Sequence, residues 1–155
     1  MIQRILIAAD GPADALRLSR AVRELFPQGG GATATILQVL PPPVPPALSS
    51  PLVPPLTAGD DVLVLGEANA RRDLAPARDE LASAGFQAEV DVATGAAGEE
   101  ICRYARAGNY QLIVVGRRGL GRLQEVLLGS VSEYVLRHTR LPVLVIQQEH
   151  PARNG

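Results

Sequence analysis

The sequence predicts an α/β fold built on one doubly wound sheet of five parallel strands, with helices on both faces. Short apolar runs rich in β-branched residues recur along the chain, and segments with apolar residues at helical spacing separate them. Strands that alternate with helices form βαβ units with right-handed crossovers, and hence a parallel sheet. The 155 residues fit one domain, and a hydrophobic content of 46 % is enough for a buried core.

The first 40 residues predict two strands with one helix between them. Residues 4–9 have the composition of a buried parallel strand, which the segment Asp10-Gly11-Pro12 ends. Asp10 suits the N-cap of a helix and Pro12 suits its first turn, and the helix extends to about Phe26. Residues 32–40 form the second strand.

Residues 41–59 form a proline-rich insert that holds eight of the 13 prolines. Because proline has no N–H donor, this segment enters neither a sheet nor a helix, and we expect an extended loop. In a parallel sheet the insert leaves from the same edge as the loop after the fourth strand. It could be a passive spacer, a flap over a ligand or a docking segment for a partner.

The second half predicts three more strands. A helical pattern comes first, from Gly59 to about Gly85, and Pro76 is expected to kink or split it. The strands and the two remaining helices are expected in this order: strand 89–94, helix 97–108, strand 112–115, helix 130–138 and strand 142–146. The domain then covers residues 1–148, and residues 149–155 are a frayed tail.

A glycine pattern follows the strand at 112–115. Gly116 and Gly119 lie in a loop, and after nine more residues Gly129 and Ser130 stand at the start of the last helix. A loop of this kind presents backbone N–H groups to an anion, and the missing Cβ atoms let a phosphate approach. Ser130 with Glu133 also matches a capping box, which needs no ligand. Both interpretations can hold, since a capping serine can face a phosphate.

The pattern Gly116-x-x-Gly119-x9-Gly129-Ser130 resembles the ATP-binding signature of the universal stress protein family. Residues 4–11, 127–135 and 141–145 are similar to that family as well. The resemblance implies a Rossmann-like sheet with the strand order 3-2-1-4-5. It also implies an ATP-binding protein of the stress response, and a homodimer in which the last strand, residues 142–146, pairs with its twin.

Carried over residue by residue, the resemblance implies an adenine-nucleotide site at the carboxyl ends of the strands. Glycines and the start of the last helix would surround the phosphates of ATP, and a Mg²⁺ ion would be bound to those phosphates. The implied residues are Ala9, Asp10, Val39, Val115, Gly116, Arg118, Gly119, Gly129, Ser130, Val131 and Ser132.

Three of these residues have more specific roles in the resemblance. Asp10 would face the ribose hydroxyls or the metal, unless it is only a helix cap. Val39 would offer backbone groups to the adenine edge. Arg118 stands where the family often has an arginine, and it could neutralise phosphate charge or be a solvated loop charge. Pro12 departs from the serine that is common in the family, which removes one hydroxyl and one N–H near the ligand.

Composition argues against several classes of function. The chain has 15 basic and 16 acidic residues and few aromatic ones, so a nucleic-acid-binding module is not expected. No segment has the features of a signal peptide or the length of a membrane span, which predicts a cytoplasmic protein without membrane contact. Cys102 is expected to be a buried apolar filler, and His138 to stabilise the end of the last helix.

The motifs also bear on catalysis. The sequence contains no Walker-type lysine after the glycines, no catalytic triad pattern and no cluster of Cys and His for a metal. A site without a placed base is expected to bind ATP far better than it hydrolyses ATP. The sequence therefore predicts a nucleotide-binding signalling protein and not an efficient enzyme. The alternatives are a slow ATP hydrolase and a structural homodimer that has lost its ligand.

Overall fold

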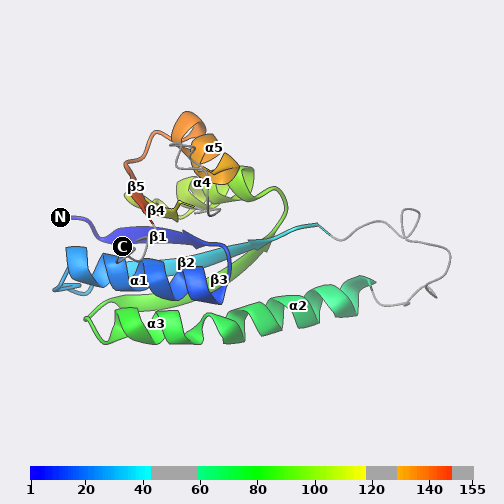
Figure 1. Ribbon diagram of the computed structural model, residues 1–155, viewed down its shortest axis with the longest axis horizontal. Coiled ribbons are helices and arrows are strands. Elements are labelled where there is room, and N and C mark those ends of the chain that lie inside the picture. Colours follow the sequence, from blue (N-terminus) through cyan, green and yellow to red (C-terminus); the bar gives the residue numbers. More distant parts are fainter. Residues whose placement is uncertain (43–58, 118–128, 148–155) are drawn as a thin grey trace, which may run out of the picture.

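The computed structural model describes residues 1–42, 59–117 and 129–147. They form one five-stranded parallel sheet in the order β3-β2-β1-β4-β5 (Figure 1). The strands are β1 (Arg4–Ala9), β2 (Thr33–Leu40), β3 (Gln87–Thr94), β4 (Leu112–Gly116) and β5 (Val143–Ile146). The doubly wound fold predicted from the sequence and the strand order implied by the resemblance are both confirmed.

Five helices are described around the sheet: α1 (Pro12–Leu25), α2 (Gly59–Asp73), α3 (Ala75–Ala82), α4 (Ala97–Ala107) and α5 (Ser130–His138). Helices α1 and α3 cover one face, and α4 and α5 cover the other (Figure 1). The predicted split at Pro76 is confirmed, because α2 ends at Asp73 and Pro76 lies in the first turn of α3. Most of the proline-rich insert (43–58), residues 118–128 and the tail from residue 148 lie outside the described residues.

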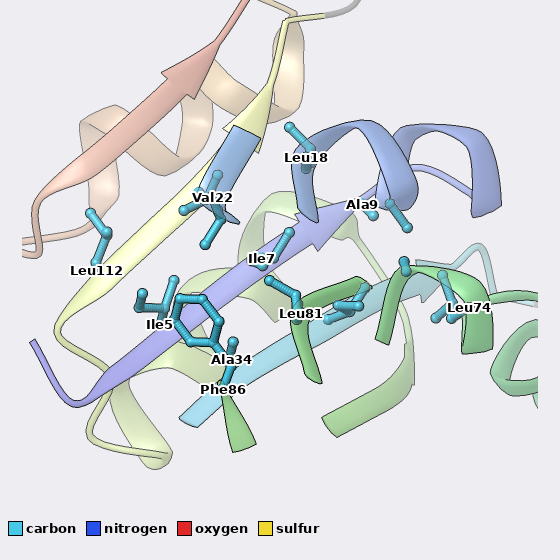
Figure 2. Close-up of a cluster of buried hydrophobic side chains, with 14 residues drawn as sticks. Ile5, Ile7, Ala9, Leu18, Val22, Ala34, Leu74, Leu81, Phe86 and Leu112 are labelled. Atoms are coloured by element: carbon cyan, nitrogen blue, oxygen red, sulfur yellow. The ribbon is translucent and has the colours of Figure 1, made fainter. Parts of the chain in front are cut away.

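The core has two layers, one on each side of the central strand β1. Ile5 and Ile7 pack under α1 and α3, as Figure 2 shows, whereas Leu6 and Ala8 pack under α4 and α5. Successive residues of a strand face opposite sides, so a strand that is covered on both sides has to be apolar throughout. Every residue from 5 to 9 is buried.

The start of α1 differs from the prediction. The N-cap is Gly11, with φ at 127°, and no side chain caps the helix. Pro12 occupies the first helical position, which places the cap on the preceding residue, and φ of this size favours glycine over aspartate. The backbone N–H of Asp10 donates instead to Oδ2 of Asp14, at 3.0 Å.

Two expectations for single side chains agree with the structure. Cys102 is buried against β1 and β4 in the layer under α4, and its burial raises the pKa of the thiol. His138 ends α5, where its Nδ1 lies 2.8 Å from the carbonyl oxygen of Tyr134. No helix in the described parts of the chain is long and apolar enough to cross a membrane.

Asp91 joins the edge strand β3 to helices on both faces. Its carboxylate lies 2.8 Å from Nη2 of Arg71 in α2, and it accepts a 2.6 Å hydrogen bond from the hydroxyl of Tyr104 in α4. Burial raises the pKa of the Asp91 carboxyl, but the hydrogen bonds from Tyr104, Arg71 and the Val92 N–H outweigh burial and hold that pKa below its usual value. Burial and the bond to Asp91 raise the pKa of the Tyr104 phenol.

We expect Asp91→Asn to reduce the loss of stability in acid. A carboxyl whose pKa is lower in the folded state stabilises the fold above its unfolded pKa of about 3.9, and this contribution disappears as the pH falls through the folded-state pKa. The difference in the free energy of unfolding between wild type and variant, measured with urea from pH 2 to 7, should therefore shrink below about pH 4. A difference that is constant with pH would contradict this. Asp79→Asn, at an exposed carboxylate in α3, is the control.

Candidate functional site

A cleft of about 600 Å³ opens where β1, β2 and β4 end. Its strand-derived walls come from Ala8 and Ala9, from Leu37 and Val39, and from Val115 and Gly116. Strands β2 and β4 flank β1 on opposite sides, and the chain leaves β1 and β4 for helices on opposite faces of the sheet. This is the topological switch point at which ligands bind in open α/β sheets, and the volume is in the usual range for a small-molecule site.

All of the predicted site residues that the structure describes line this one cleft: Ala9, Asp10, Val39, Val115, Gly116, Gly129, Ser130, Val131 and Ser132. Arg118 and Gly119 lie outside the described residues. Strands β1, β2 and β4 and the first turn of α5 bring these nine together from positions up to about 120 residues apart. Their convergence follows from the parallel sheet, because carboxyl ends of parallel strands meet at one edge.

Three helices begin at the cleft. The first turns of α1, α4 and α5 contribute Ala13, Ala97 and Ser130, among other residues, to its lining. The first N–H groups of a helix have no partner within the helix, and its dipole places positive charge at that end. Apolar strand ends beside such helix starts can accommodate a flat apolar group and an anion together.

The predicted capping box at α5 is not present. The N-cap is Gly129, with φ at −57° and ψ at 153°, and no side chain caps the helix. Ser130 is already helical, so the N–H of Glu133 bonds to the carbonyl of Gly129, at 3.0 Å. The Glu133 carboxylate pairs with Arg137 one turn further on, at 2.6 Å, and does not reach back to the helix start. The Ser130 side chain is exposed at the cleft.

Ser132 has a structural contact. Its hydroxyl is buried and donates a 3.0 Å hydrogen bond to the carbonyl of Gly116. This bond joins the first turn of α5 to the end of β4 and thereby fixes the helix start relative to the sheet.

We expect Ser130→Ala to change the free energy of unfolding by less than about 0.5 kcal/mol, as exposed positions without a cap usually do. Ser132→Ala is the matched comparison, and its loss of a buried hydrogen bond should cost about 1 kcal/mol or more. Urea unfolding of both variants checks this. A loss of about 1 kcal/mol for Ser130→Ala would mean that the serine caps α5 in solution.

The sequence analysis did not predict Asp14 and Arg17 of α1, a charged pair that lines the cleft. They form an ion pair at 2.5 Å, and Nη1 of Arg17 lies 3.5 Å from the carbonyl oxygen of Ile146 in β5. Their i, i+3 spacing directly after the first strand is a signal that places both side chains on one helix face near the cleft.

The described part of the chain holds no group of three or more His, Cys, Asp or Glu side chains that could bind a metal ion. The carboxylates that line the described part of the cleft are Asp10 and Asp14, and the lining cations there are Arg17 and Arg117.

Sequence comparison matches the chain to one family. The family model described as the universal stress protein family matches residues 1–147. A universal stress protein of Bacillus subtilis is 41% identical over 71 residues, which are 46% of this chain and 48% of that protein. One from Synechocystis is 46% identical over 63 residues, 41% of each chain. The match thus spans less than half the length of each of these two relatives.

Solved structures share the fold over nearly the whole chain. The structure of protein MJ0577, a universal stress protein of Methanocaldococcus jannaschii, has a TM-score of 0.74 at 22% identity and covers 97% of this chain and 99% of its own. A universal stress protein of Archaeoglobus fulgidus in complex with dAMP has a TM-score of 0.62 at 21% identity, covering 94% of this chain and 99% of its own. An Arabidopsis thaliana family member with AMP bound has a TM-score of 0.62 at 16% identity, covering 97% of each chain.

Structural similarity at such low sequence identity establishes the fold alone. The relationship is established by the family model, which extends over all but the last eight residues: the chain belongs to the universal stress protein family.

Proposed function

We propose that this protein binds an adenine nucleotide, ATP in the first place, and acts as a regulator in the stress response. The observation that supports the proposal most is the convergence of nine residues of the family's binding pattern on one cleft. Family members of the same fold that hold dAMP or AMP add support from outside the chain. Arg118 and Gly119 would complete the site.

The proposed binding mode assigns the base and the phosphates to different strands. Adenine would lie at the end of β2, where Val39 offers backbone groups. The phosphates would lie at the start of α5, against Gly129 and the N–H groups of its first turn. Asp10 would face the ribose or a Mg²⁺ ion that the phosphate oxygens hold, since Mg²⁺ usually keeps few protein ligands.

We further propose that turnover is slow at most. The charged side chains that line the described part of the cleft are two aspartates and two arginines, and one of the aspartates, Asp14, is paired with Arg17. Neither histidine nor lysine lines that part of the cleft. Among the side chains that line the described part of the cleft, only a carboxylate could act as a general base, and carboxylates are ordinarily weak bases at neutral pH.

Titration calorimetry of the purified protein with ATP and Mg²⁺ tests the proposal, after mass spectrometry of the denatured sample for co-purified nucleotide. We expect binding of one nucleotide per chain, with ADP release no faster than about one turnover per minute, far below ordinary kcat values. Failure of ATP, ADP and AMP to bind to nucleotide-free protein would overturn the proposal. Metal-dependent ADP release faster than about one turnover per minute, and above a control without protein, would favour the slow hydrolase instead.

A homodimer through β5 is the second part of the proposal. Strand β5 is an edge of the sheet among the described residues, and its four residues are all apolar and half-buried. An apolar edge strand of this kind is a pairing site unless something covers it, and a second copy would cover it by symmetry. Sedimentation velocity should give a dimer at micromolar concentration, and a monomer throughout would reject this part.

A further inference from the structure

Gly116 has neighbours that the glycine pattern does not predict. A Cβ atom built on Gly116 would overlap the Arg17 guanidinium and would lie 2.9 Å from Oδ1 of Asp14. Contacts this close essentially never occur at real Cβ atoms. On the α1 face, the first glycine of the pattern therefore leaves the space that the ion pair occupies, and a Cβ at this position would displace the guanidinium.

Several contacts hold the Arg17 guanidinium beside Gly116. It pairs with Asp14, whose other oxygen accepts the Asp10 N–H at 3.0 Å, and it lies 3.5 Å from the carbonyl oxygen of Ile146. The side chains of the pair are only 28% and 24% exposed. With the described residues these contacts use one N–H of each terminal nitrogen, which leaves three of the five guanidinium donors for an acceptor outside them.

Arg17 lies toward one end of the cleft. It contacts β4 and β5, whereas Val39 belongs to β2, on the other side of β1. Adjacent strands are roughly 4.8 Å apart, so the ends of β2 and β4 are separated by about 10 Å. A nucleotide with its base at β2 would therefore extend its phosphates toward β4, and the outermost phosphate toward Arg17.

The chain contains no lysine, so each of its 15 basic side chains is an arginine. Arginine binds phosphate through paired, charge-assisted hydrogen bonds and cannot lose its charge at neutral pH. An anion in the cleft also meets the carboxylates of Asp10 and Asp14. A cation that is held in place beside Asp14 offsets this repulsion.

We propose that Arg17 makes the cleft selective for the number of phosphates on its ligand. Its guanidinium, seated on Gly116 and held by Asp14, contacts the outermost phosphate of ATP and has less to contact in AMP. This inference rests on the proposed nucleotide-binding function and adds a specificity residue to it.

The test compares Arg17→Met with Arg20→Met by calorimetry against ATP, ADP, AMP and adenosine at one ionic strength. We expect Arg17→Met to weaken ATP binding about 10- to 100-fold, the range of one or two charge-assisted bonds, and adenosine binding by less than about twofold. Arg20 lies on the same helix outside the cleft, with its side chain 62% exposed, and its variant should bind all four ligands like wild type.

Asp14→Asn distinguishes an effect of the positive charge of Arg17 from an effect of the Asp14–Arg17 ion pair on the structure. This variant keeps the cation and removes the negative charge, while the amide oxygen of the new side chain can still accept the hydrogen bond that holds the guanidinium. The preference for ATP over AMP should therefore be retained or increased. Circular dichroism melting confirms that each variant is folded at the temperature of the titration. If Asp14→Asn loses ATP as Arg17→Met does, the pair acts only by holding the structure and the inference is wrong.

The outcomes also distinguish the inference from the function on which it rests. Wild-type protein that binds none of the four ligands overturns the proposed function. Wild-type protein that binds ATP, together with an Arg17→Met variant whose ATP-to-AMP affinity ratio is unchanged, overturns only the role of Arg17.

Gly116→Ala should displace the Arg17 guanidinium and reproduce the loss of ATP affinity seen in Arg17→Met. The two losses should not add in the double variant. Additive losses would contradict the seating of Arg17 by Gly116.

Discussion

Gly129→Val is expected to weaken ATP binding by at least about 100-fold while the protein still folds, because a phosphate at a helix start needs several backbone N–H contacts that a branched side chain would block. Gly129 lines the cleft at the N-cap of α5. Its φ of −57° and ψ of 153° belong to the extended region that every residue adopts, so valine introduces no backbone strain there. The loss of a favourable N-cap residue should cost only about 1 kcal/mol.

Calorimetry with ATP and urea unfolding measure the two effects separately. Gly66→Ala is the control, since Gly66 lies in α2 and a Cβ there would meet nothing within 4 Å. We expect this control to bind ATP like wild type and to be more stable by about 0.5–1 kcal/mol, as alanine is in helix interiors. Unchanged ATP affinity in Gly129→Val would place the nucleotide somewhere other than the start of α5.

Ile7→Ala is expected to lower the free energy of unfolding by about 2–5 kcal/mol. Ile7 lies at the centre of β1, opposite Ile36 in β2 and Val114 in β4, and its side chain is fully buried under α1 and α3 (Figure 2). Truncation leaves a cavity between the sheet and the helices α1 and α3. A sheet that is covered by helices on both faces cannot move far enough to fill such a cavity.

Urea unfolding checks the size of this loss, with Leu25→Ala as the exposed comparison at the end of α1. That control should change stability by no more than about 0.5 kcal/mol. Below the melting temperature Ile7→Ala should still bind ATP, because the Ile7 side chain is not part of the cleft lining. A loss below about 1 kcal/mol would contradict the central position of β1 in the core.

The secondary structure was accessible from the sequence because each element carries its own local pattern. The apolar run before Asp10 has no polar residue to expose, and that alone indicates a strand covered on both faces. The predicted last helix has the same bounds as α5. The third strand starts at Gln87, two residues earlier than predicted, since Gln87 and Ala88 pair with Thr33 and Ala34 of β2. Pairing of this kind depends on the neighbouring strand and leaves no mark on the strand's own residues.

The N-caps of α1 and α5 were each predicted one residue away from their positions. Asp10 and Ser130 are good capping residues, yet the caps are the glycines Gly11 and Gly129. A capping preference amounts to about 1 kcal/mol, which the geometry of a strand-to-helix turn can override. The positive φ at Gly11 and the proline that follows it decide the first case.

The position of the cleft was predictable as far as topology determines it. The rule that ligands bind at the carboxyl ends of parallel strands brings Val39 and Gly116 to one cleft without any knowledge of side-chain contacts. That rule could not predict the contact of the Asp14–Arg17 pair with Gly116, because this contact depends on how α1 crosses the end of β4. Their spacing was visible in the sequence, but the distance to Gly116 was not.

A crystal structure of the protein grown with ATP and Mg²⁺ tests the nucleotide site most directly. We expect electron density for adenine beside Val39, for the phosphates at Gly129 and the first turn of α5, and for the outermost phosphate within hydrogen-bonding distance of Arg17. ATP bound at another surface, or an empty cleft in crystals at saturating ATP, would contradict the proposed site.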